Sequence, residues 1–176
     1  MRLVLVRHPQ PDLAPGICYG RSDVSTSIEA IAQLAAGLRA AGLPGDLPVH
    51  ASPLLRCATL AAALDVPVTL DARLAEMDFG AWEMRAWDAI PRAEVDAWAA
   101  DLLHYRPGGG ENVLEVARRV AAFRQELRHP ALVVCHAGTI RLLSALHAGG
   151  AIEQAALRAA SNSHRIGYGE VIVLKD

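Results

Sequence analysis

Two histidines in this 176-residue sequence directly follow short apolar segments that are typical of buried strands. Leu3–Val6 leads into Arg7 and His8, and Ala131–Cys135 leads into His136. Because the carboxyl ends of neighbouring parallel strands meet at one edge of a sheet, we expect both histidines at the same rim. A neutral imidazole nitrogen is a nucleophile towards phosphorus and forms a covalent intermediate with it.

An arginine and a glutamate are expected to reach the same rim from two further segments. Arg56 lies in the first turns of a helix after Val49–Ala51, and Glu76 lies in the loop after Val66–Leu70. Arginines hold the peripheral oxygens of a phosphoryl group, and a glutamic acid can protonate the leaving oxygen. This set of residues predicts phosphoryl chemistry through a phosphohistidine. No metal or cofactor is expected, since the arginines neutralise the charge.

This division of roles makes a prediction about pH. His8 must be neutral to attack phosphorus, whereas Glu76 must be protonated to donate. A free imidazole has a pKa near ~6.5 and a free glutamic acid has a pKa near ~4.3. We therefore expect the site to raise the pKa of Glu76, or the activity to have a mildly acidic optimum.

Apolar segments that alternate with amphipathic segments must position these residues. The pattern predicts strands at Leu3–Val6, Val49–Ala51, Val66–Leu70, Ala131–Cys135 and Val171–Leu174. It predicts helices at Ser27–Ala41 and Gly138–Ala148, and helical pieces between Met84 and Leu103. A further helix begins at Ser52 as N-cap and ends at about Leu64, and another begins at the capping box of Asn112 and Glu115 and ends at about Arg128. This alternation favours an α/β sandwich with a mostly parallel sheet.

Composition and charge argue against several classes of protein. The formal net charge of −2 gives no general attraction to nucleic acid or to an anionic membrane, and no apolar run approaches the ~18 residues of a membrane span. The cysteines Cys18, Cys57 and Cys135 are odd in number and lack CxxC spacing, so we expect a reducing compartment. We interpret Cys57 and Cys135 as small buried apolar residues. Without a leader-like start, the sequence predicts a cytoplasmic protein.

Other kinds of active site lack their motifs. The segment PGGGENV (107–113) has no Lys-Ser/Thr pair of a P-loop and follows no predicted strand. The sequence contains no HExxH of a zinc hydrolase and no GxSxG of a serine hydrolase. We interpret the tryptophans Trp82, Trp87 and Trp98 mainly as core or cap residues.

Five segments, in order, resemble motifs of the histidine phosphatase superfamily, which includes the cofactor-dependent phosphoglycerate mutases. They are LVLVRHPQP (3–11), HASPLLRCATLAAAL (50–64), DARLAEMDFGAWE (71–83), PGGGENVLEVARRV (107–120) and LVVCHAGTIRLL (132–143). The resemblance implies a three-layer α/β/α sandwich of the phosphoglycerate mutase type, in a single domain over residues 1–176. It also implies a histidine acid-type phosphatase, which is a phosphoric monoester hydrolase.

The resemblance implies a role for each matching residue. His8 would be the phosphorylated nucleophile, with Glu76 as the proton donor. Arg7, Arg56 and His136 would form the phosphate pocket. These roles agree with those expected from the residue types alone.

Within the superfamily, the stretch PDLAPGICYGRSD (11–23) is similar to a loop of alpha-ribazole phosphatases, which dephosphorylate a late intermediate of cobalamin synthesis. We therefore expect alpha-ribazole 5′-phosphate as the substrate, with Tyr19, Arg21, Trp82 and Tyr105 as candidates for contacting it. A small broad-specificity phosphatase fits the chain length equally well. A phosphoglycerate mutase-like phosphotransferase and a non-catalytic phospholigand-binding protein are the other hypotheses. The partner would be a small phosphorylated metabolite, and monomer and homodimer both stay open.

The sequence departs from the family pattern at two glycines. Pro9 replaces the glycine after Arg-His, and it has no N–H. It therefore either removes a backbone donor near phosphate or only fixes the loop. Met84 replaces the glycine that follows the Trp-Glu pair.

Overall fold

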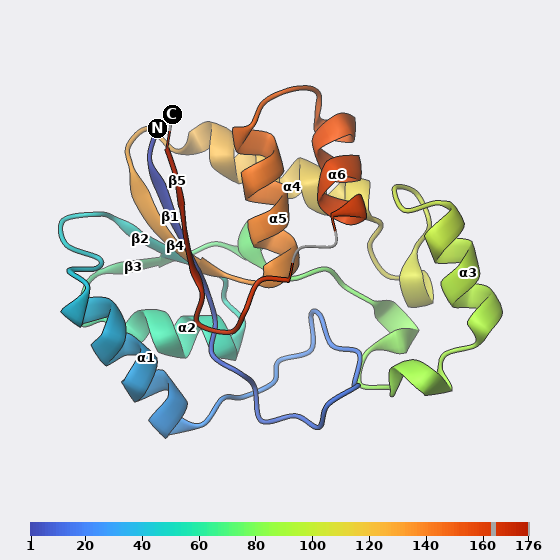
Figure 1. Cartoon of the computed structure of the whole chain (residues 1–176), viewed down its shortest axis with the longest axis horizontal. Helices are drawn as coiled ribbons and strands as arrows, with labels where there is room; N and C mark the ends of the chain where they lie inside the picture. The colour runs from blue at the N-terminus through green and yellow to red at the C-terminus, as the bar shows by residue number, and fades with distance from the viewer. Residues whose placement is uncertain (163–164, 176) are drawn as a thin grey trace.

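A five-stranded sheet lies at the centre of the molecule in this computed structural model, which describes residues 1–162 and 165–175 (Figure 1). The strands are β1 (Leu3–Arg7), β2 (Val49–Ala51), β3 (Val68–Leu70), β4 (Ala131–Cys135) and β5 (Val171–Leu174). Their order is β3-β2-β4-β1-β5, and among them only β5 runs antiparallel to its neighbour. The prediction of a mostly parallel sheet is confirmed.

Helices cover both faces of the sheet, because its central strands are apolar on both sides. The helices are α1 (Ile28–Ala40), α2 (Leu55–Ala62), α3 (Arg92–Ala100), α4 (Val113–Glu126), α5 (Ala137–His147) and α6 (Ile152–Ser161). Along β1, Leu3 and Leu5 face the core with α4, α5 and α6, whereas Val4 and Val6 face α1 and α2. The strand β4 alternates in the same way. The three-layer α/β/α sandwich is therefore confirmed (Figure 1).

Local side-chain hydrogen bonds explain where two of these helices begin. Ser27 is the N-cap of α1, and α4 has the predicted capping box of Asn112 and Glu115. The helix α6, whose Ala155 and Ala156 are completely buried, was not predicted. Its buried face consists of alanines, which mark an apolar face less clearly than leucine or isoleucine does. None of the helices in residues 1–162 and 165–175 is long and apolar enough to span a membrane.

The start of α2 differs from its prediction. Ser52 does not cap this helix, which begins at Leu55 with Leu54 as N-cap and no side-chain cap bond. Instead, Ser52 N–H donates to Val134 O of β4 at 3.0 Å, so Ser52 still belongs to the ladder of the sheet. Its side chain consequently lies at the carboxyl edge of the sheet, where the chemistry is expected.

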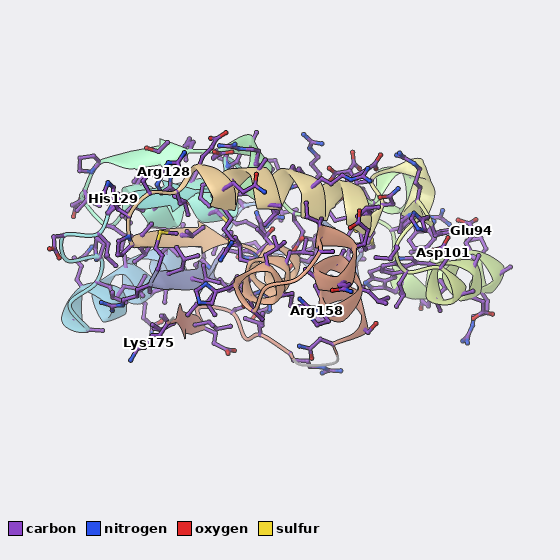
Figure 2. The ribbon with its side chains drawn as sticks, turned by 90° about the horizontal axis from the view of Figure 1, so that it is seen from above. Glu94, Asp101, Arg128, His129, Arg158 and Lys175 are labelled. Atoms are coloured by element: carbon purple, nitrogen blue, oxygen red, sulfur yellow. The ribbon has the colours of Figure 1, made fainter. Side chains whose placement is uncertain are left out.

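Residues 79–110 form a lobe, called here the α3 lobe, at one end of the molecule. Figure 2 shows Glu94 and Asp101 of this lobe at the end opposite Arg128 and His129. Between Met84 and Leu103 it contains one short 3₁₀ turn and α3, as the prediction of helical pieces requires. Met84 has a φ of +61°, a conformation that favours glycine, which explains why the family pattern has a glycine there.

Candidate active site

The register of β1 and β4 brings the two predicted histidines together. Arg7 pairs with Cys135, and the next residue, His8, donates its N–H to Cys135 O at 3.1 Å. His136 follows Cys135, and the ring centroids of the two histidines lie 5.2 Å apart. Both rings line one cavity, and their residues are only 2% and 1% exposed. The parallel pairing of two strand ends is sufficient to explain this meeting.

The two nitrogens of the His8 ring lie in different environments. Nδ1 lies 2.6 Å from Pro9 O, and because a carbonyl oxygen only accepts, Nδ1 carries the proton. Burial lowers the pKa of His8 to about 3 despite this hydrogen bond, and the charges of Arg56 and Arg7 add to the effect. His8 is therefore neutral at pH 7, with a lone pair on Nε2. This is the state in which a histidine attacks phosphorus.

His136 is the N-cap residue of α5 and contacts two residues that follow β2. Its Nε2 lies 2.8 Å from Ser52 Oγ and 3.5 Å from Cys57 Sγ. Burial, and then the charge of Arg56, lower the pKa of His136 well below its ordinary value. At pH 7 it offers a neutral hydrogen-bonding nitrogen. Cys57 and Cys135 are completely buried, as predicted, and burial raises the pKa of both thiols.

Two arginines reach the same cavity. Arg56 is completely buried, and its Nη1 donates to Ser22 O at 2.8 Å while its Nη2 donates to Gly20 O. Arg7 Nη1 donates to Ile166 O. In the described part of the chain, the Nε–H of each arginine is buried without a hydrogen-bond partner. A buried unpaired donor costs roughly 1–3 kcal/mol, so this arrangement fits an anion that would pair with both.

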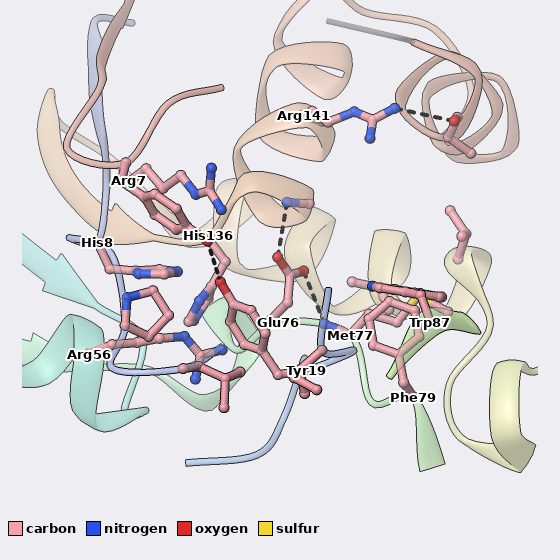
Figure 3. A pocket seen from close by; sticks show the side chains of 18 of the residues that line it. Arg7, His8, Tyr19, Arg56, Glu76, Met77, Phe79, Trp87, His136 and Arg141 are labelled. Carbon is pink, nitrogen blue, oxygen red and sulfur yellow. Dashed lines mark hydrogen bonds between the residues drawn. The ribbon is translucent and has the colours of Figure 1, made fainter. Parts of the chain in front are cut away.

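Glu76 reaches the cavity from the segment between β3 and α3 (Figure 3). Its Oε1 accepts from Met77 N, and its Oε2 accepts from Gly138 N, both at 3.0 Å. Gly138 belongs to the first turn of α5, so a backbone N–H at the start of this helix positions the Glu76 side chain. A Cβ at position 138 would overlap Glu76 Oε1, so only glycine leaves this carboxylate in place.

Tyr168 is a cavity residue that the sequence did not indicate. The guanidinium of Arg7 lies 3.9 Å from the centroid of its ring, and its hydroxyl lies 2.9 Å from Tyr19 OH. The guanidinium of Arg56 lies over the ring of Tyr19, at 5.3 Å. The two tyrosines thus form a hydrogen-bonded pair that contacts both arginines. No local pattern could reveal this pair, because its members stand 149 positions apart.

The cavity has a volume of about 850 Å³ and two unlike ends. Figure 3 shows Arg7, His8, Arg56 and His136 on one side of Glu76, and Met77, Phe79 and Trp87 on the other side. We call the first group the histidine end. The apolar end is the opposite wall, formed by Phe79, Trp87, Val95 and Trp98 of the α3 lobe. Arg141 also lines the cavity, with its Nη2 donating to Ala160 O at 3.2 Å.

Of the four residues expected to contact the substrate, only Tyr19 lines this cavity. Arg21 is exposed outside it, and Tyr105 packs against the small core of the α3 lobe. Trp82 is completely buried in that core, where its Nε1 donates to Glu94 at 2.7 Å. The paired indole N–H explains why Trp82 is turned away from the cavity.

Trp87 and Trp98, interpreted from the sequence as core or cap residues, both line the cavity. Each packs against Trp82, with ring centroids 6.2 Å and 5.8 Å from it. Trp82 occupies the core of the α3 lobe, and the indoles of Trp87 and Trp98 lie between it and the cavity. In residues 1–162 and 165–175, no three His, Cys, Asp or Glu side chains are grouped so as to hold a metal ion.

A sequence model of the histidine phosphatase superfamily (branch 1) matches residues 3–166. The chain is 32% identical over 167 residues to a bifunctional protein of Mycobacterium tuberculosis, in an alignment that covers 86% of this chain and 46% of that protein. It is 30% identical over 165 residues to a glucosyl-3-phosphoglycerate phosphatase of Mycolicibacterium vanbaalenii, covering 82% and 72% of the two chains. The chain thus spans about half the length of the first of these relatives.

The fold is similar to that of solved structures over almost the whole chain. The alpha-ribazole phosphatase from Shigella flexneri superimposes with a TM-score of 0.82 and 27% sequence identity. The superposition covers 99% of this chain and 90% of that protein.

Proposed function

The chain belongs to the histidine phosphatase superfamily, and we propose that it hydrolyses small phosphomonoesters through a phosphohistidine at His8. One observation carries this proposal: His8 is neutral, its Nδ1–H is held by Pro9 O, and it lies beside two arginines with unpaired Nε–H groups. The free lone pair on Nε2 is suited to attack phosphorus, and the arginine donors are suited to bind the phosphoryl oxygens. The relatives named as phosphatases support hydrolysis.

The reaction would take two steps. In the first, His8 Nε2 forms a bond to phosphorus, the bond to the leaving oxygen breaks, and Glu76 donates its proton to that oxygen. In the second, water attacks the phosphohistidine and Glu76 takes a proton from the water. The P–N bond then breaks, which releases phosphate and restores His8. Arg7 and Arg56 hold the peripheral oxygens in both steps, with His136 as a neutral neighbour.

The apolar end supports a leaving group with a flat apolar body. Phe79, Trp87 and Trp98 offer aromatic surfaces, and Trp98 Nε1–H is buried without a partner among the described residues. Alpha-ribazole 5′-phosphate, a nucleotide with an aromatic base, suits such a wall. A substrate such as 3-phosphoglycerate would bring a second charge against apolar side chains, at a cost in desolvation. We therefore propose the ribazole ester as the substrate, in cytoplasmic cobalamin synthesis.

Phosphate release in the presence of EDTA tests this proposal with three compounds: alpha-ribazole 5′-phosphate, p-nitrophenyl phosphate and 3-phosphoglycerate. We expect hydrolysis of the first two, with the highest kcat/KM for the ribazole ester. Hydrolysis of p-nitrophenyl phosphate alone would favour a broad-specificity phosphatase. Conversion of 3-phosphoglycerate to its 2-isomer would indicate a mutase instead.

A trapping experiment tests the intermediate. Labelled substrate mixed with the protein and denatured at alkaline pH, where phosphohistidine survives, should leave label on wild-type protein and none on His8→Ala. Binding of inorganic phosphate without hydrolysis of any ester would overturn the proposal. That result would indicate a phospholigand-binding protein.

A further inference from the structure

Glu83, in the α3 lobe, does not line the cavity but binds a loop beside it. Its Oε2 accepts from Gly20 N at 2.9 Å, from Ser22 N at 3.2 Å and from Ser22 Oγ at 2.6 Å. Its Oε1 accepts from Arg21 N and Phe79 N, both at 2.9 Å. One carboxylate therefore holds three consecutive residues of a distant loop, mainly by their backbone.

The same loop holds the guanidinium of Arg56. Arg56 Nη1 donates to Ser22 O at 2.8 Å, and Nη2 donates to Gly20 O. Asp23, which follows Ser22, accepts a hydrogen bond through Oδ1 from Leu55 N, the first residue of α2, at 2.6 Å. The loop is thus attached to Glu83 by its N–H groups and to Arg56 by its carbonyl oxygens.

Two features describe how closely this loop is held. A Cβ on Gly20 would overlap Met77 O, so the loop lies in close contact with the segment after Glu76. Burial opposes ionisation of Glu83, but hydrogen bonds from Ser22 and from the backbone outweigh it and hold its pKa below the usual value. An ionised carboxylate offers two acceptor oxygens, with about four lone pairs that the five donors share, whereas a neutral amide has one acceptor oxygen.

We propose that Glu83 is the positioning residue of Arg56. It fixes residues 20–22 so that two carbonyl oxygens orient the guanidinium, whose Nε–H stays available for a phosphoryl oxygen. Glu83 touches no reacting atom and acts through Arg56. The kinetic part of this inference rests on the proposed function. The binding part requires only that the site takes an oxyanion.

Vanadate binding, measured by isothermal titration calorimetry, tests the proposal without turnover. Glu83→Gln should raise the Kd of vanadate about 10-fold and lower kcat/KM about 30-fold, because buried N–H groups lose their acceptor and Arg56 loses its orientation. The matched control is Glu94→Gln in the same lobe, since Glu94 accepts from Trp82 Nε1 away from the loop and an amide oxygen can still accept that bond. The control should stay within about twofold of the wild type.

A double-mutant cycle separates positioning from a general structural role. In an Arg56→Ala background, Glu83→Gln should lower kcat/KM less than about 3-fold, because the group that it orients is absent. A merely structural role would lower kcat/KM about 30-fold in both backgrounds. If Glu83→Gln does not fold, Ser22→Ala replaces it in the cycle. That variant removes one hydrogen bond to Glu83 and should raise the Kd of vanadate about 3-fold.

Unchanged vanadate affinity in folded Glu83→Gln, or equal losses in both backgrounds, would overturn this inference. A wild-type protein that binds vanadate but hydrolyses no ester would refute the proposed function alone. In that case the cycle, carried out on vanadate affinity, would still decide the role of Glu83.

Discussion

The histidine end and the apolar end of the cavity are built from different kinds of structure. At the histidine end, His8 and His136 follow the ends of two buried, paired strands. At the apolar end, Trp87 lies in a 3₁₀ turn and Trp98 lies in α3, a helix in which no residue is buried. Strand ends hold reacting groups in place, whereas a lightly packed lobe accepts changes of side chain at low cost. For the proposed function, we therefore expect the reaction to depend on the sheet and the choice of leaving group to depend on the lobe.

Changes of side chain at the two ends of the cavity should affect the substrate range differently. Changes at the histidine end should affect all phosphomonoesters and inorganic oxyanions alike. Changes at the apolar end should affect only esters whose leaving group reaches the aromatic wall.

Replacement of His8 should have the largest effect. His8→Ala removes the nucleophile, so kcat should fall at least about 10⁴-fold for every ester in steady-state assays. The fold should survive, as judged by circular dichroism, because the ring lines a cavity rather than the apolar core. The control is His129→Ala, which should keep full activity; His129 lies at the end of the molecule opposite the α3 lobe in Figure 2. Near-normal turnover of His8→Ala would refute the mechanism.

The buried histidines should make stability depend on pH. The pKa of His8 is about 3 in the folded protein and near 6.5 in the unfolded chain, so the unfolded chain binds more protons between these values. The free energy of unfolding should therefore fall as pH drops from 6.5 towards 4, by about 1.4 kcal/mol for each unit of pKa difference that is crossed. His136 should act in the same direction.

Urea titrations of wild type and His8→Gln in phosphate-free buffer measure this dependence. The slope of unfolding free energy against pH should be shallower in His8→Gln, which cannot take up that proton. Equal slopes in the two proteins would mean that His8 titrates normally. The neutrality of the histidine end would then need another explanation.

Loss of Glu76 should separate poor leaving groups from good ones. Glu76→Gln should slow hydrolysis of an alkyl phosphate about 10²–10³-fold, since general acid catalysis is worth that much. p-Nitrophenyl phosphate should lose less in the first step, because its leaving group departs without a proton. Gly138→Ala, which displaces the carboxylate by overlap, should show the same pattern more weakly. Equal losses for both esters would argue against Glu76 as the acid.

The smallest expected effect concerns the apolar end. Trp98→Ala should lower kcat/KM about 10-fold for an ester with an aromatic leaving group, through lost apolar and aromatic contact. The Kd of vanadate should stay unchanged in Trp98→Ala. The control is Leu157→Ala, at an exposed residue, which should leave both quantities unchanged. If Trp98→Ala weakened vanadate and the aromatic ester equally, the division of the cavity into two ends would be incorrect.

Much of the fold could be read from local pattern. The strands β1 and β4 are short apolar runs that end at a charged or polar residue, and the capping box of α4 lies within four residues. The helix α6 was not predicted because its buried face consists of alanines, which mark an apolar face less clearly than leucine or isoleucine does. Ser52 has the residue type of an N-cap, but its hydrogen bond to β4 decides its conformation.

The gathering of His8, His136, Arg56 and Glu76 could be predicted from the sequence, since each follows a predicted strand and parallel strands share a carboxyl edge. The groups that support these four side chains could not be predicted, because they depend on tertiary contacts. Ser52 on His136, Tyr168 on Arg7 and Glu83 beneath the loop of Arg56 are all contacts between residues more than 60 positions apart. A periodic pattern of apolar residues indicates the local secondary structure. The pairing of two distant polar side chains depends on how the whole chain packs.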